Sequence, residues 1–102
     1  MEKIIDRFLR YIAVDTASDP ESASQPSTNK QFVLLEMLKN ELQAMGVEAT
    51  LDQYGYVMAS IPSNAEGKEI PALGFIAHVD TSPDMSGKDV RPRVIEEYDG
   101  CD

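Results

Sequence analysis

His78 and Asp80, a histidine and an aspartate two positions apart, are the residues of this sequence best suited to chemistry. His78 is the only histidine of the 102-residue chain, and it closes an apolar run that predicts a strand over residues 72–79, buried on both faces. Side chains at i and i+2 of a strand share a face, so the carboxylate is expected beside the imidazole. A histidine that binds a metal needs such an acceptor on its second ring nitrogen.

Two interpretations of this pair remain open on spacing alone. In the functional one, His78 is a metal ligand held by Asp80 at the carboxyl end of a strand, where the sites of open α/β sheets gather. In the structural one, a partly buried histidine bonds to a nearby backbone group, and Asp80 begins a turn through residues 81–83. An H-x-D spacing occurs by chance in many proteins and does not separate the two.

The helices that must position the pair follow from apolar periodicity. Helical spacing predicts one helix over residues 2–14 and another over residues 29–45. Thr28 and Gln31 match the capping-box pattern at the start of the second helix. Gly46 suits the left-handed conformation that ends a helix.

The strands follow from a change of period. Alternating apolar and polar residues predict strands over residues 47–52 and 56–61, joined at a Tyr54–Gly55 turn. Another short strand is expected over residues 90–96. Two helices followed by strands indicate an α/β fold, a layered sheet with two N-terminal helices.

Two polar segments of the sequence are predicted to be loops. A long loop over residues 15–27 separates the helices, and its Thr16 and Ser18 are expected to serve as capping or turn residues. The polar residues that follow the pair are interpreted as solvated loop residues rather than as the mouth of a site: Asp84, Ser86, Lys88 and Asp89.

Composition excludes several classes of partner and location. The net charge of −9 argues against nucleic acid and anionic membranes as partners. Charged residues interrupt the apolar stretch near the first methionine, so no signal peptide is expected. Cys101 is the single cysteine and can form no internal disulfide, which favours the cytoplasm.

The segment GFIAHVDTSPDMSGKDVRP, with YGYVMASIPSN and PSTNKQ upstream, closely resembles the peptidase T family, the tripeptide aminopeptidase branch of the M20 zinc metallopeptidases. The resemblance extends over essentially all 102 residues. The HVDTSPD motif is specific to this branch, whereas the broader family shares only the H-x-D portion. The resemblance implies that His78 is the first zinc ligand and that Asp80 is the catalytic-site residue that clamps its imidazole.

The resemblance also implies what should lie outside this chain. Such enzymes use two zinc ions and a glutamate base to activate the water that attacks a short peptide with a free amino terminus. The other ligands, the base and a lid or dimerisation domain are expected beyond Asp102. Residues 1–102 would then be the incomplete N-terminal portion of a zinc-exopeptidase catalytic domain, inactive alone.

Two alternatives to the enzyme interpretation stay open. One is a non-catalytic peptide- or metal-binding α/β module derived from the same fold. The other is a structural domain in which His78 is only packed. If the chain is a fragment, its sheet is cut short and leaves an open edge, so the isolated chain is expected to associate with itself.

Overall fold

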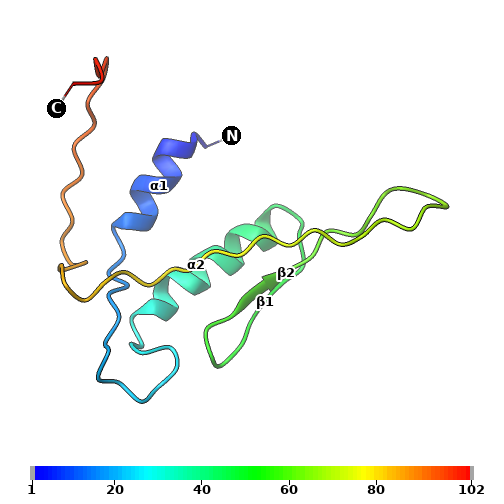
Figure 1. Cartoon of the computed structure of the whole chain (residues 1–102), viewed down its shortest axis with the longest axis horizontal. Coiled ribbons are helices and arrows are strands. Elements are labelled where there is room, and N and C mark those ends of the chain that lie inside the picture. The colour runs from blue at the N-terminus through cyan, green and yellow to red at the C-terminus, as the bar shows by residue number, and fades with distance from the viewer. Residues whose placement is uncertain (1, 102) are drawn as a thin grey trace.

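The structure, a computed structural model, describes residues 2–101 and contains two helices followed by a two-stranded antiparallel sheet (Figure 1). Helix α1 spans Ile4–Ile12, and helix α2 spans Gln31–Ala44. Strand β1, Ala49–Leu51, pairs with strand β2, Val57–Ala59. The predicted α/β class is confirmed, and all four elements lie inside their predicted bounds. Among the described residues, neither helix has the length and apolar character needed to cross a membrane.

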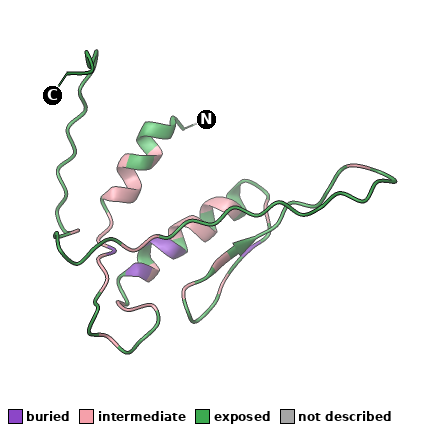
Figure 2. Cartoon of the chain, in the orientation of Figure 1, coloured by how far each residue is buried: buried purple, intermediate pink, exposed green. Residues whose placement is uncertain are grey.

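A small core lies between α2 and the β1–β2 hairpin (Figure 2). Its buried apolar residues among residues 2–101 are Leu34, Leu35 and Ala49. Gly55 closes the hairpin turn with a φ of +85°, and a Cβ at this position would lie 3.2 Å from the Leu35 side chain. Both the backbone conformation and the close approach to α2 therefore require glycine at the predicted turn.

The two ends of α2 differ in how well they match the sequence pattern. At the carboxyl end Gly46 adopts a φ of +81°, and the Val47 N–H donates to the Leu42 carbonyl at 3.0 Å, as in a Schellman motif. At the amino end the predicted capping box is wrong, because no side chain caps the helix. The Thr28 hydroxyl instead donates to the Ala17 carbonyl at 2.9 Å and holds the preceding loop.

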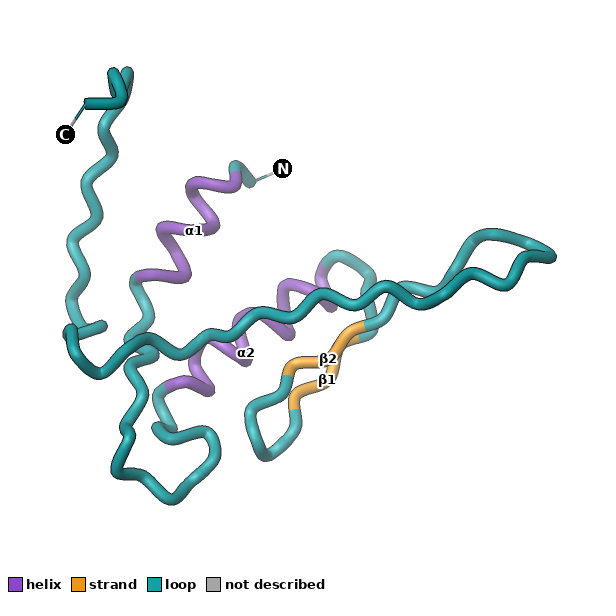
Figure 3. Tube along the Cα trace, viewed as in Figure 1, coloured by secondary structure: helices purple, strands orange, loops and turns teal. Residues whose placement is uncertain are grey.

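The prediction of a buried strand over residues 72–79 is wrong in this structure. The segment is an extended trace without a strand partner (Figure 3), and Phe75 and Ile76 are 91% and 100% exposed. The strand predicted over residues 90–96 is also absent from the described chain. In both places the physical reason is the same: within residues 2–101 no second strand lies alongside to accept the backbone hydrogen bonds.

The described helices and strands do not enclose a complete hydrophobic core, and much of their apolar surface is exposed. The accessible surface is 8939 Å², about one and a half times the roughly 5,700 Å² expected for a folded 11.3 kDa protein. The radius of gyration is 17.2 Å, against about 13 Å for a compact domain of this length. The predicted apolar stripe of α1 is present but uncovered, with Ile4 87% exposed and Phe8 55% exposed.

Helix α1 is attached to α2 through a polar network. The Tyr11 hydroxyl donates to the Glu41 carboxylate, which also forms an ion pair with Arg10. Arg10 reaches back to Glu2 at 2.8 Å. Burial and the Glu41 carboxylate together raise the pKa of Tyr11 to about 12. Burial opposes the charge on Glu41, but the contacts with Tyr11 and Arg10 outweigh it and hold the pKa of Glu41 below its usual value.

We expect Glu41→Gln to lower the pKa of Tyr11, because the carboxylate is one of the causes that raise it. The Glu41 contribution to stability is present above the unfolded pKa of 4.5 and is lost as the pH falls through the lower folded pKa. The Tyr11 contribution to stability is present below the unfolded pKa of 10.0 and is lost as the pH rises through the folded pKa of about 12. An absorbance titration of the tyrosines measures the shift.

The matched control for this titration is Glu48→Gln, which removes one exposed carboxylate between α2 and β1. This control should leave the Tyr11 transition where it is in the parent chain. A Tyr11 transition that does not move in Glu41→Gln would show that the interhelical contact is not formed.

The open segment over residues 72–79 predicts self-association of the isolated chain. Unpaired backbone groups between exposed apolar side chains are a template for another strand. Ile76→Lys places a charge on this segment and should reduce the association, whereas Gln53→Lys adds the same charge in the hairpin turn and should not. Sedimentation velocity over a concentration series measures the effect, and a monomer at every concentration would contradict the prediction.

Candidate metal-binding and catalytic site

The pairing of His78 with Asp80 predicted from their spacing is present in the structure. The His78 Nδ1 atom lies 2.9 Å from the Asp80 carbonyl oxygen and 3.1 Å from its carboxylate Oδ1. Both partners can only accept a hydrogen bond, so the proton of the neutral ring must be on Nδ1, which donates to them. The lone pair is then on Nε2, the atom through which an imidazole in this tautomer binds a metal.

The His78 side chain is 81% exposed, so the interpretation as a partly buried histidine is wrong. The other part of that interpretation, a bond to a local backbone carbonyl, is present together with the carboxylate contact. The expected strand end is also absent, and the pair instead lies in extended backbone. The proximity of the two side chains therefore does not depend on a completed sheet.

The polar loop after α1 holds the backbone around the pair. Thr16 is 3% exposed, and its hydroxyl donates to the Val79 carbonyl at 2.8 Å. The Thr81 N–H donates to the Thr16 carbonyl at 3.2 Å, and the Ser18 N–H donates to the Thr81 carbonyl at 2.9 Å. Thr16 and Ser18 therefore do not serve as the capping or turn residues expected, because their partners lie far along the chain.

The loop that follows the pair approaches the same region closely. A Cβ on Gly87 would lie 2.8 Å from Oδ1 of Asp15. Asp15 is itself fixed, because its carboxylate accepts from the Ala17 N–H at 3.1 Å and pairs with Lys30 at 2.9 Å. The hydrogen bond from Lys30, followed by that from Ala17, holds the pKa of Asp15 below its usual value. Asp15 is thus a fixed carboxylate against which the loop rests.

An apolar groove of about 630 Å³ lies beside the pair, between α1, α2 and the extended segment. His78 and Val79 line one wall, and Tyr11 and Leu38 are among the helix residues opposite. Asp84, Ser86, Lys88 and Asp89 are all exposed loop residues as expected, and Ser86 also lines this groove.

No carboxylate lines the groove, and residues 2–101 contain no cluster of three or more His, Cys, Asp or Glu side chains that could hold a metal ion. The described chain therefore offers a single oriented imidazole and its carboxylate partner. That arrangement fits one ligand of a metal site and the group that orients it, but it does not form a complete site.

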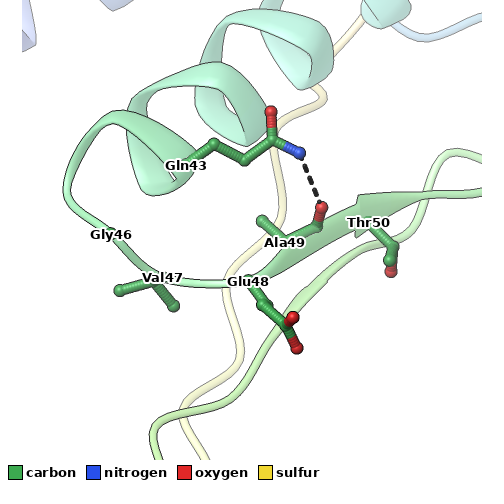
Figure 4. Close-up of a pocket in the computed structure, with 6 residues that line it drawn as sticks. All are labelled: Gln43, Gly46, Val47, Glu48, Ala49 and Thr50. Atoms are coloured by element: carbon green, nitrogen blue, oxygen red, sulfur yellow. Dashed lines mark hydrogen bonds between the residues drawn. The ribbon is translucent and has the colours of Figure 1, made fainter.

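A second hollow lies at the other end of α2, where the chain turns into β1 (Figure 4). The Gln43 side-chain amide donates to the Ala49 carbonyl across it at 3.0 Å. Glu48 is the one titratable residue in its lining. This hollow therefore belongs to the packing of α2 against the hairpin and brings no set of reactive groups together.

Gly87→Ala is expected to loosen the contact between the two loops, because the new Cβ would displace the fixed Asp15 carboxylate. Overpacking of this kind costs about 1–3 kcal/mol, so the protected Thr81 and Ser18 amides should exchange with solvent roughly tenfold faster or more. Gly74→Ala is the matched control, since nothing lies within 4 Å of a Cβ there. Amide hydrogen exchange by NMR measures the effect, and equal exchange in both variants would contradict the contact.

No protein-family model matches the chain. It is 56% identical over 104 residues to Peptidase T of Alkaliphilus oremlandii, an alignment that covers 100% of this chain and 25% of that protein. It is 51% identical over 102 residues to Peptidase T of Geobacillus thermodenitrificans and 50% identical over 103 residues to that of Clostridium novyi, again across 25% of each relative. The chain thus spans about a quarter of the length of the curated relatives it matches. This similarity to Peptidase T extends along the whole length of the chain.

Proposed function

We propose that this chain is the N-terminal portion of the catalytic domain of an M20-type, zinc-dependent tripeptide aminopeptidase, which releases the N-terminal residue of tripeptides. The observation that carries the proposal is the His78 imidazole, exposed and held in one tautomer by Asp80. The similarity to Peptidase T supports the peptidase part of this proposal. The tripeptide class of substrate is supported only by the name that these relatives carry. The expected location is the cytoplasm.

Each residue of the pair has a separate role in this proposal. His78 would hold zinc through Nε2. Asp80 would keep the ring in the required tautomer and orientation, and its negative charge would make the imidazole a stronger donor to a cation. When bound, zinc supplies a Lewis acid that polarises a carbonyl and generates a nucleophilic water at neutral pH.

The isolated chain is proposed to be inactive, because the described residues provide one ligand and no assigned general base. The match leaves about three quarters of each relative's length outside this chain. The remaining ligands, the base and the lid or dimerisation domain are proposed to lie there. The substrate is a short peptide with a free amino terminus, and the negative charge of the chain argues against nucleic acid and membranes as partners.

The lone metal ligand also supports a second candidate, a non-catalytic peptide- or metal-binding module that keeps the fold. The two candidates differ in whether bound peptide is cleaved. Tripeptide hydrolysis by the full-length protein that carries this sequence, with and without a chelator, therefore separates them.

His78→Ala should lower kcat/KM by about 100-fold or more and reduce zinc content. Removal of a residue that only hydrogen-bonds to a metal ligand already lowers metal affinity or activity by about 10–100-fold. Asn64→Ala, in an exposed loop, is the control and should leave both unchanged. Hydrolysis that survives both the chelator and His78→Ala would contradict the metal mechanism. Peptide binding without any cleavage would favour the non-catalytic module, and hydrolysis by the isolated chain would contradict its proposed inactivity.

A further inference from the structure

We infer that Thr16 is a positioning residue for the His78–Asp80 pair. It bonds to the backbone on both sides of Asp80, through its own hydroxyl and its own carbonyl. This inference rests on the proposed function, since it assigns to Thr16 a task in that site. It concerns the orientation of the imidazole and not any contact with substrate.

The geometry connects Thr16 to the ring through one peptide group. The Asp80 carbonyl, which accepts from His78 Nδ1 at 2.9 Å, and the Thr81 N–H belong to the same peptide group. That N–H donates to the Thr16 carbonyl at 3.2 Å. Because a peptide group is planar, fixing its N–H fixes the direction in which its oxygen points. Thr16 and His78 therefore hold opposite ends of one rigid unit.

The hydroxyl of Thr16 fixes the preceding peptide group in the same way. It donates to the Val79 carbonyl at 2.8 Å, and this carbonyl shares its peptide plane with the Asp80 N–H. Both peptide groups of Asp80 are thus oriented by a single residue. The Asp80 carboxylate lies 3.1 Å from His78 Nδ1. Because the backbone of Asp80 is held on both sides, the position of this side chain is restricted as well.

Burial distinguishes Thr16 from its neighbour Ser18. Thr16 is 3% exposed, so water cannot replace its hydroxyl, and its removal would leave the Val79 carbonyl without that donor. The Ser18 hydroxyl also donates, to the Thr81 carbonyl at 3.0 Å, but this bond is exposed to solvent. Water can take over an exposed bond at little cost, so the two hydroxyls should differ in importance.

The test uses the full-length enzyme with Thr16→Val, which keeps the shape and removes the hydroxyl, and Thr16→Ser, which restores it. Thr16→Val should lower kcat and zinc affinity by about tenfold each, with KM changed by less than about twofold. Thr16→Ser should recover most of both losses. Ser18→Ala and Thr50→Val are the controls: the first removes the exposed hydroxyl, and the second makes the same substitution on exposed β1.

A second measurement does not depend on zinc or activity. In the metal-free enzyme labelled with ¹⁵N-histidine, the His78 signals are assigned by their loss in His78→Ala. The wild type should show the Nδ1–H tautomer, and Thr16→Val should shift the signals toward the Nε2–H form, whereas both controls should not. If the wild type hydrolyses no tripeptide, the proposed function fails, but this comparison still decides the role of Thr16.

Three outcomes would overturn the inference. One is a folded Thr16→Val enzyme whose tautomer signals and zinc affinity match the wild type. Another is a Thr16→Ser enzyme as impaired as Thr16→Val, since packing and not the hydroxyl would then matter. The third is global unfolding of both Thr16→Val and Thr16→Ala, because the hydroxyl would then serve the fold as a whole.

Discussion

The packing of α2 against the β1–β2 hairpin is the interaction on which the rest of the chain depends. Leu35, whose buried side chain lies against the turn at Gly55, stabilises this packing by about 1.5–3 kcal/mol. Helix α1 and the His78 segment then attach to this unit mainly through hydrogen bonds and ion pairs. Ordering about a hundred residues costs far more entropy than so small a core returns. The described chain thus leaves much of its apolar surface uncovered, and it spans about a quarter of the length of its relatives.

Features governed by local physics were predictable from the sequence. The Gly46 helix end and the Gly55 turn depend on one residue's freedom to adopt positive φ, and both are present. Apolar periodicity located both helices within a few residues of their observed ends. The contact between His78 and Asp80 is also local, since only one residue separates them, and it forms even though the expected strand does not.

Features that depend on distant partners were not predictable. An apolar run shows that residues 72–79 can be buried but not what would cover them, and in the described chain residues 72–78 are exposed. A hydroxyl in a polar loop has many partners within reach, so the sequence favoured local bonds for Thr16 and Thr28. Both instead hold other segments, Thr16 at Val79 and Thr28 at Ala17. Burial distinguishes Thr16 from ordinary loop residues, and burial is a property of the fold.

The separation of 63 residues between Thr16 and Val79 has a consequence for the order of folding. Loop closure over such a distance costs chain entropy and slows the formation of a contact, whereas the hairpin and helices need only near neighbours. The hairpin on α2 is therefore expected to form before Thr16 meets Val79, so the backbone on either side of Asp80 is fixed only after two remote segments have come together.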